Sequence, residues 1–229
     1  MKSLSQIVRK LAVIGACAGT MMISSAASAF VIYKTGVDNS NSVAAAGTSD
    51  LHWILDSVPN GSSYVTQVLT SVSGFPIAPN GPWIGDNGIS AWIAPLYISG
   101  TNPGSNVVGS YIYTQSFFVS AAELAASPTL NGRFALDNWS NNIILNFNNT
   151  GISLPFDPAG TDFTQWHSFN INTGFVEGVN TLSFYVINSP GGVNGNPSGL
   201  RVEVPEPGTL ALVGLALFGF GAARRRKQK

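Results

Sequence analysis

Few residues of the 229-residue chain carry side chains suited to acid–base or metal chemistry. Its two histidines are His52 and His167, and the chain has neither a G-x-S-x-G nor an H-E-x-x-H motif. Asp50, His52 and Asp56 lie close in sequence, so they suggest a metal site or an acid–base pair. On a strand, residues 50 and 52 share a face. The alternative is therefore that His52 and Trp53 only dock an N-terminal strand.

Asp137 and Asp157 form a second candidate, because glycosidases use two carboxylates at a defined separation. Asp137 precedes Asn138 and a polar turn, so its alternative role is a hydrogen-bond acceptor that orders this loop. Oxygen donors dominate and Cys17 is the only thiol, which favours Ca²⁺ over Zn²⁺ for any metal site. The sequence identifies no catalytic residue and no metal ligand, and a structural Ca²⁺ is the one cofactor it leaves open.

Five tryptophans are candidates for stacking against sugar rings: Trp53, Trp83, Trp92, Trp139 and Trp166. Core packing is the alternative for each of them, since a tryptophan buries a large apolar area. Trp92 and Trp166 lie in expected strands and are assigned to the core. Trp83 and Trp139 stand between polar loop residues. We therefore expect Trp83 or Trp139 to contribute to an exposed, glycan-facing surface.

The chain ends with VPEPGTLALVGLALFGFGAARRRKQK, from Val204 to Lys229. The prolines of Pro205-Glu206-Pro207 resist helix, and the uncharged segment Thr209–Ala223 follows. Its length as a helix is roughly 22 Å, short for a hydrocarbon core of about 30 Å, although arginines can snorkel to the interface. The cluster after it marks the cytoplasmic side and comprises Arg224, Arg225, Arg226 and Lys227. The segment thus predicts a C-terminal transmembrane helix.

This order of triplet, short apolar helix and basic tail resembles the PEP-CTERM sorting signal of Gram-negative bacteria, over residues 205–229. The resemblance implies processing by an exosortase, a membrane Cys protease-transpeptidase, with cleavage near Pro205 to Pro207. The chain would be anchored in the inner membrane transiently and would then reach the cell surface or the extracellular space. An ordinary single-pass anchor is the alternative.

The first 29 residues have the order of a secretory signal peptide. A basic start precedes the apolar stretch Leu11–Ile23 and the small-residue site Ala27-Ser28-Ala29. We expect export through the Sec translocon and cleavage by signal peptidase between Ala29 and Phe30. Ile14-Gly15-Ala16-Cys17 loosely fits a lipobox, which would instead make Cys17 a lipidated N-terminus. The apolar run continues past Cys17, which argues against that alternative.

The formal net charge of zero hides an acidic centre, because eight of the eleven basic residues lie in the two terminal segments. Residues 30–204 hold Lys34, Arg133 and Arg201 against ten acids, a net charge of −7. Nucleic acid is therefore excluded as a partner, since its binding needs Lys and Arg at the phosphates. With Cys17 in the signal, the mature chain has no disulfide and depends on its core. The length of residues 30–204 predicts one domain.

Apolar and polar residues alternate along residues 53–204, which predicts half-buried antiparallel strands. In segment 199–204, for example, Leu200, Val202 and Val204 share one face, while Arg201 and Glu203 share the opposite face. Many short strands over this length predict an all-β fold, an antiparallel two-sheet β-sandwich.

Turns and one short helix are predicted between these strands. Asn-Gly pairs, including Asn131-Gly132, predict tight turns because both residues tolerate positive φ. Residues 120–126 predict a short helix with Ser120 as N-cap and Glu123 completing a capping box. In Gly178-Val179-Asn180, the glycine is expected to turn the chain and Asn180 to cap that turn.

The order of several segments is similar to the galactose-binding-like jelly roll: 50–53, 91–95, 109–120, 132–138, 143–146, 175–188 and 196–204. The resemblance implies a jelly-roll sandwich of the kind found in bacterial surface proteins and in accessory modules of glycoside hydrolases, often with one structural Ca²⁺. The family often has Asn-Gly after the strand at 143–145. Here Phe147 follows Asn146, so the geometry of that turn is open.

Together these features predict an exported, exosortase-processed surface or extracellular-matrix protein that is non-catalytic and associated with exopolysaccharide. Its partners would be the exosortase, the Sec translocon, signal peptidase, the membrane before processing, and exopolysaccharide. Two alternatives stay open. The first is a structural biofilm protein acting through protein–protein contacts, and the second is a carbohydrate-active enzyme with an unrecognised site.

Overall fold

A computed structural model describes residues 30–59, 65–95, 106–155, 157–158, 162–190 and 196–205. The predicted signal helix and the predicted transmembrane helix lie outside these residues. So do several predicted processing residues: Ala27, Ala29, Glu206, Pro207, Arg224, Arg225 and Arg226. Phe30 and Pro205 are the first and last described residues.

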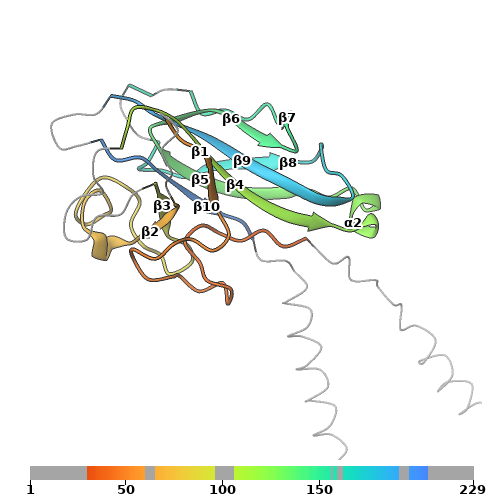
Figure 1. Ribbon diagram of the computed structural model, residues 1–229, viewed down its shortest axis with the longest axis horizontal. Helices are drawn as coiled ribbons and strands as arrows, with labels where there is room; N and C mark the ends of the chain where they lie inside the picture. The colour runs from red at the N-terminus through yellow and green to blue at the C-terminus, as the bar shows by residue number, and fades with distance from the viewer. Residues whose placement is uncertain are drawn as a thin grey trace, which may run out of the picture. The chain divides into compact units, whose positions relative to one another are not determined.

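The first sheet has the strand order β1-β4-β9-β6-β7, and every pair in it is antiparallel (Figure 1). Its long strands β4 and β9 pair without interruption, from Gly109 opposite Asn188 to Val119 opposite Gly178. The strands are β1 (Ile54–Ser57), β4 (Gly109–Val119), β9 (Gly178–Asn188), β6 (Trp139–Leu145) and β7 (Asn148–Asn149).

The second sheet has the order β2-β3-β10-β5-β8 and is also antiparallel throughout. Its strands are β2 (Gln67–Leu69), β3 (Trp92–Ala94), β10 (Gly199–Glu203), β5 (Leu130–Asp137) and β8 (His167–Ile171). The only helices of the described chain are η2 (Ser71–Ser73) and α2 (Ala121–Ala125). The predicted all-β, antiparallel two-sheet β-sandwich is therefore confirmed.

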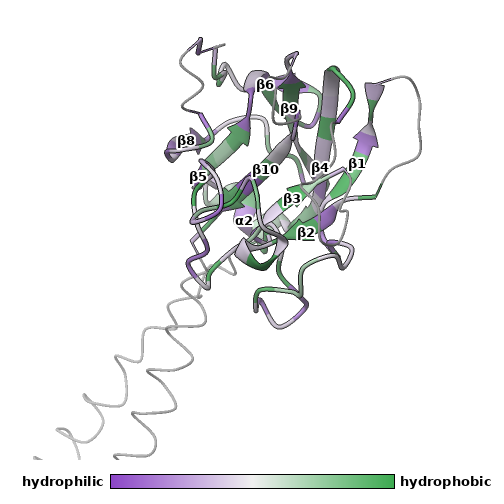
Figure 2. Cartoon of the chain, turned by 90° about the vertical axis from the view of Figure 1, so that its left-hand side faces the viewer, coloured by the Kyte–Doolittle hydropathy of each residue, from purple (hydrophilic) through white to green (hydrophobic). Residues whose placement is uncertain are grey.

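The main core lies between the two sheets and is built by the alternation in the strands (Figure 2). Phe184 of β9 packs edge-on against Trp53, Phe134 and Phe169, with ring centroids 5.8, 5.4 and 5.9 Å away. The predicted inward residues of β10, Leu200, Val202 and Val204, all belong to this core. Because it lacks a disulfide, the sandwich depends on this apolar burial for its stability.

The predicted capping box and turn cap are both present. Ser120 Oγ accepts a hydrogen bond from the Glu123 N–H at 3.2 Å, while the Glu123 carboxylate accepts from the Ser120 N–H at 2.7 Å. The buried Asn180 side chain bonds Val176 and Gly178, and Gly178 has a φ of 99°. These residues serve the framework, as the sequence predicted.

Segment 70–90 packs over the outer face of the second sheet and adds a third layer. Its Ile77 and Trp83 form a separate apolar cluster with Trp92 and Ala94 of β3 and with Ala135 of β5. The prediction of half-buried strands is therefore wrong for β3, β5 and β10 in this region, because both faces of the sheet are covered there. All five residues of β10 are buried.

The Asn131-Gly132 pair is not a turn but lies inside β5, so that prediction is wrong. A Cβ on Gly132 would lie 2.5 Å from the Phe169 ring and 2.8 Å from the carbonyl oxygen of Glu203. Gly132 is thus required for the close approach of an aromatic ring and a neighbouring strand.

Asn146 and Phe147 form the two-residue turn between β6 and β7, with φ values of 50° and 65°. Positive φ at both positions is the pattern of a type I′ hairpin turn, which favours Asn-Gly. The usual geometry is therefore kept although Phe147 replaces glycine. The Phe147 side chain is 94% exposed, so little packing offsets the cost of its backbone conformation.

We expect Phe147→Gly to raise the free energy of unfolding by about 1 kcal/mol, because glycine adopts positive φ without a Cβ clash. Urea denaturation of the full-length chain in detergent measures this change. Phe147→Ala is the matched control, since it removes the exposed ring but keeps the Cβ. A gain of equal size in both variants would show that the ring, and not the backbone, is responsible.

Candidate functional site

The Asp50 carboxylate is occupied by main-chain groups. It accepts hydrogen bonds from the N–H groups of Gly36, His52 and Trp53 at 2.6–2.8 Å. Burial raises the pKa of Asp50, and these hydrogen bonds oppose that shift. The His52 ring lies flat on Tyr33, with centroids 3.6 Å apart. This arrangement supports docking of the N-terminal segment rather than a metal site or an acid–base pair.

Trp83 does not offer a stacking surface, so its predicted exposure is wrong. Its side chain is 1% exposed and packs on Trp92, with ring centroids 4.3 Å apart. Its Nε1–H donates to Asp137 at 3.0 Å. The polar residues around Trp83 suggested an exposed loop. Segment 70–90 instead packs on the second sheet and buries this side chain. Trp139 is half-buried at the start of β6 and donates to Ser189, and its contact with glycan stays a prediction.

The buried carboxylate next to Asp137 is that of Asp162, which the sequence analysis did not single out. Burial raises the pKa of Asp137 to about 7, the Trp83 hydrogen bond opposes this, and the negative charge of Asp162 adds to it. Asp157 acts electrostatically on Asp162. Over the described residues, no three His, Cys, Asp or Glu side chains are grouped so that they could hold a metal ion.

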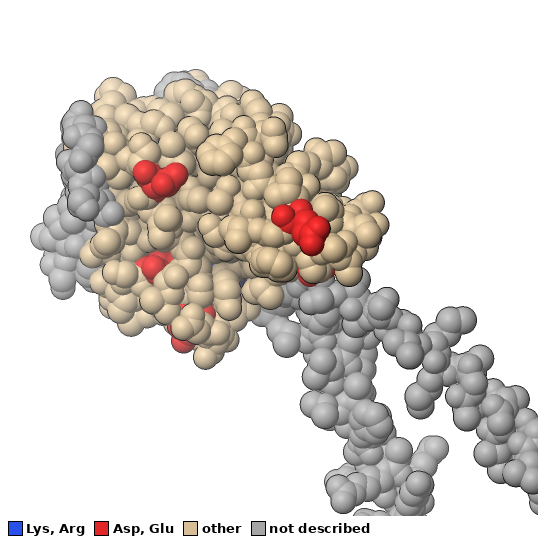
Figure 3. Space-filling view, turned by 45° about the vertical axis from the view of Figure 1, so that its right-hand side comes forward, with Lys and Arg blue, Asp and Glu red and all other residues tan. Residues whose placement is uncertain are grey.

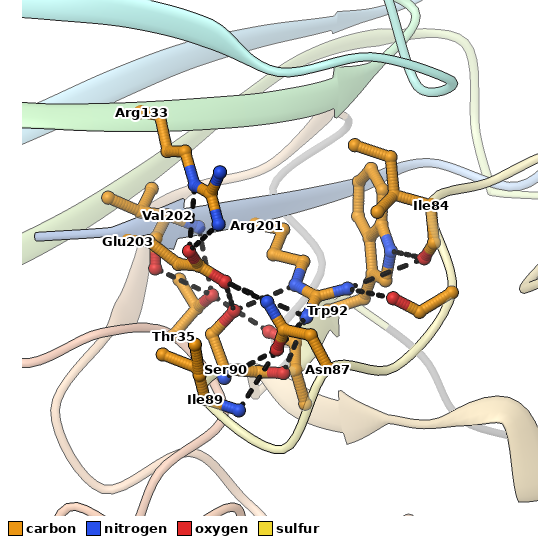
Figure 4. Close-up of polar contacts among 12 residues, drawn as sticks. Thr35, Ile84, Asn87, Ile89, Ser90, Trp92, Arg133, Arg201, Val202 and Glu203 are labelled. Carbon is orange, nitrogen blue, oxygen red and sulfur yellow. Dashed lines mark hydrogen bonds and ion pairs between the residues drawn. The ribbon is translucent and has the colours of Figure 1, made fainter.

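Arg201 of β10 is fully buried and binds the loop at residues 84–90 (Figure 4). Its guanidinium donates to the Ser90 side chain, to the carbonyl oxygens of Gly85 and Ser90, and to Asn87, at 2.6–2.8 Å. Burial lowers the pKa of Arg201 to about 10, and Glu203 opposes that shift. Arg201 therefore remains charged at neutral pH and holds the third layer on the sheet.

Glu203 joins this network to the surface. One carboxylate oxygen accepts from Asn87 and Ser90 at 2.6 and 2.7 Å, and the other accepts from Arg133 Nε and Nη2 at 2.8 and 2.6 Å. Arg133 also lies over the Trp166 ring, 4.4 Å from its centroid. The Arg133 side chain is 44% exposed, so Glu203 and Trp166 orient a cation that solvent can still reach.

Beside this network is an open groove of about 630 Å³, within the usual size range of ligand sites. It is lined by Lys34, Asn41, Arg133, Ser168, Glu203 and Pro205, among others. Two of the three cations of residues 30–204 thus meet at one place in an acidic domain. By contrast, Figure 3 shows a face with several acidic side chains and no cluster of Lys or Arg. The described lining of the groove therefore holds two cations, of which Lys34 is buried, and one acid, Glu203.

One feature of the sequence could have indicated this groove. Residues 30–204 have three cations, so each of them was a candidate for a specific role. Arg201 and Glu203 were assigned to one strand face, but the alternation could not show that a loop covers that face. Nor could it show that Arg133, which lies 70 positions before Glu203, bonds its carboxylate.

The described chain leads directly into the predicted sorting segment. Val204 is in the core and 5% exposed, while Pro205 is exposed and borders the groove. No helix among the described residues is long and apolar enough to cross a membrane. The predicted span Thr209–Ala223 lies beyond them. Phe30, the predicted mature N-terminus, packs on Phe117 and Phe175.

Comparison with known proteins confirms the sorting signal. Residues 203–227 match the PEP-CTERM protein-sorting motif. The motif indicates an exported chain that an exosortase processes at the membrane. No curated protein matches the chain.

Two solved structures are similar to the chain. One is a family 35 carbohydrate-binding module from an environmental isolate, with 14% identity over 68% of this chain and 93% of that chain, and a TM-score of 0.33. The other is a CBM35 from Cellvibrio japonicus, with 13% identity over 67% and 92% and a TM-score of 0.29. Similarities this low give no information about a ligand.

Arg201→Met is expected to lower the free energy of unfolding by about 3–5 kcal/mol, because it leaves the buried acceptors of loop 84–90 without their donor and removes the positive charge 3.8 Å from Glu203. Arg133→Gln is the matched control. It removes a partly exposed partner of the same glutamate, so its cost should be about 1 kcal/mol or less. Urea denaturation compares the two, and equal losses would contradict the structural role of Arg201.

Glu203 should contribute stability that acid removes. Burial tends to raise its pKa, but the hydrogen bonds from Asn87, Ser90 and Arg133 outweigh burial, so its pKa lies below the ordinary 4.5. A carboxylate with a lowered pKa stabilises the fold above its unfolded value, and this contribution is lost as the pH falls through the folded pKa.

The free energy of unfolding should therefore fall as the pH drops below the ordinary value of 4.5 and through the lower folded pKa, and Glu203→Gln should show a smaller fall. Denaturation at a series of pH values measures both slopes. Glu177→Gln, which changes an exposed glutamate, should keep the wild-type slope. A Glu203→Gln slope as steep as that of the wild type would contradict this assignment.

Proposed function

We propose that this exported protein is a non-catalytic surface or extracellular-matrix component that binds acidic exopolysaccharide in the groove beside Arg133. The observation that carries the proposal is the position of Lys34 and Arg133 in one groove of a domain with few other cations. The sorting motif supports it by placing the chain on the export route.

The chemistry of the groove suits a carboxylate-bearing sugar. Arg133 is oriented by Glu203 and Trp166 while remaining partly exposed, so its guanidinium can donate to a ligand without reorganising. Ser168 and Asn131 are exposed on the same lining and supply neutral donors and acceptors for hydroxyl groups. Ile89, which is 45% exposed, adds an apolar surface.

The acidic groups near the groove favour binding over hydrolysis. A glycosidase needs two carboxyl groups that flank the bond to be cut. The Glu203 carboxylate lines the groove, but both of its oxygens are engaged by Asn87, Ser90 and Arg133. It is the only acid among the described lining residues.

A structural role through protein–protein contacts is the second candidate, and one surface feature favours it. Phe118 of β4 and Val179 of β9 are opposite each other on the outer face of the first sheet and are 62% and 67% exposed. Phe147, 94% exposed, follows Asn146, which bonds Thr181 two residues beyond Val179. Exposed apolar groups of this kind mark many protein contacts.

Co-sedimentation of the full-length chain with exopolysaccharide from its own cells tests the proposal. Arg133→Gln should weaken binding about tenfold, because it removes a charged donor. Carboxyl reduction of the polysaccharide should have a similar effect, and Glu177→Gln should change nothing. Binding that survives both Arg133→Gln and carboxyl reduction would rule out the groove. Association of the chain with itself that is lost in Phe118→Ser would favour the structural role.

A further inference from the structure

Both edges of β10 are occupied close to its end. On one side Glu203 pairs with Arg133 of β5. On the other side the Val202 N–H donates to Thr35 Oγ1 at 2.9 Å, and the Val202 carbonyl oxygen accepts from the Thr35 N–H at 3.1 Å. An extended peptide is commonly recognised as an added strand, through free main-chain N–H and C=O groups. Because these groups of Val202 are already bonded, a processing enzyme cannot bind this part of β10 in that way.

The side chains at the end of β10 are fixed as well. Glu203 is 7% exposed, and both of its carboxylate oxygens are bonded. Val204 is 5% exposed and belongs to the main core. A protease could bind these two residues only after β10 had opened locally, which would break a hydrogen-bond network and expose the core. Pro205 is the first exposed residue after β10.

The segment after Val204 contains two kinds of peptide bond. The bonds that precede Pro205 and Pro207 are tertiary amides, because their nitrogen has no hydrogen and belongs to the pyrrolidine ring. That ring crowds the carbonyl group that a protease must attack. The chain from Val204 to Gly208 therefore has two secondary amide bonds, Pro205–Glu206 and Pro207–Gly208.

The end of β10 discriminates between these two bonds. For a cut after Pro205, the residues that the enzyme must bind just before the bond include Glu203 and Val204, which are buried. For a cut after Pro207, the preceding residues are Pro205-Glu206-Pro207, all of which follow the end of β10 at Glu203. The second bond is thus the one that leaves β10 undisturbed.

We propose that the exosortase indicated by the sorting motif cleaves the bond between Pro207 and Gly208. The thiolate of its cysteine attacks the Pro207 carbonyl carbon, the C–N bond breaks, and the Gly208 nitrogen takes a proton and leaves as a new amino terminus. Water then hydrolyses the thioester, which restores the thiolate and leaves a carboxylate on Pro207. A primary amine in place of water would form an amide there.

The resemblance to the sorting-signal family implied only a range for the cut, near Pro205 to Pro207, and the folded strand selects one bond at its end. This inference does not depend on polysaccharide binding in the groove.

Mass spectrometry of the protein from its own cells tests the proposal. Trypsin cleaves after Arg201, so the terminal peptide should be VEVPEP, which runs from Val202 to Pro207. It should carry either a free carboxyl group or an amine-linked group on Pro207. A chain that ends at Pro205, at Val204 or earlier would overturn the proposal, and so would a chain that keeps its C-terminal segment.

Two substitutions of the same residue test the bond directly in cells. Gly208→Pro turns the bond into a tertiary amide and should lower the processed fraction about tenfold or more, with uncleaved chain in the membrane fraction. Gly208→Ala keeps a secondary amide and is the matched control, so it should be processed like the wild type. Processing of Gly208→Pro at the wild-type rate would contradict the proposal.

An insertion tests whether β10 selects the bond. Gly-Ser-Gly-Ser placed between Val204 and Pro205 moves the Pro205–Glu206 bond away from the strand. We expect a second product that ends at Pro205, because the residues before this bond are then no longer part of the fold. A single product ending at Pro207 would show that the enzyme alone, and not β10, selects the bond.

Discussion

The buried guanidinium of Arg201 is the constraint on which the outer layer and the groove depend. A charge with no exposure is tolerated only where its donors are satisfied, and here they meet three carbonyl oxygens and two side chains of segment 84–90. The loop is thereby fixed on β10, and its Ile84 packs against the cluster that contains Trp83 and Trp92. Asn87 and Ser90 bond both Arg201 and Glu203. Glu203 in turn pairs with Arg133, so the buried and the partly exposed arginine belong to one network.

The same strand links the fold to export. The match to the sorting motif begins at Glu203, the residue that orients Arg133, and Val204 is still in the core. β10 ends at Glu203, and Pro205, two residues further on, has no N–H and cannot extend its ladder. Processing near Pro205 to Pro207 would take place within a few residues of the folded groove. The end of β10 and the exposed Pro205 are therefore parts of one short segment that the sorting motif also covers.

The inward residues of the strands could be predicted from the sequence, because they follow from local alternation. Contacts between segments far apart in the chain could not. Period two identified Leu200, Val202 and Val204 as residues of one face, and all three are in the core. The pattern describes a strand with one buried face, so it could not reveal that segment 70–90 buries the second face at Arg201. Trp83 was misjudged for the same reason. Gly132 was read as a turn because the ring of Phe169, which requires it, lies far along the chain.

Arg133 and Asp137 lie four residues apart on β5, and the shortage of positive charge affects their surroundings differently. At Arg133, one of three cations in residues 30–204 is paired with Glu203 and stays partly exposed. At Asp137, two acids are buried with no arginine beside them, and the fold supplies only a tryptophan N–H and a nearby histidine. The same shortage of cations therefore leaves Glu203 paired and ionised beside Arg133, while burial raises the pKa of both Asp137 and Asp162.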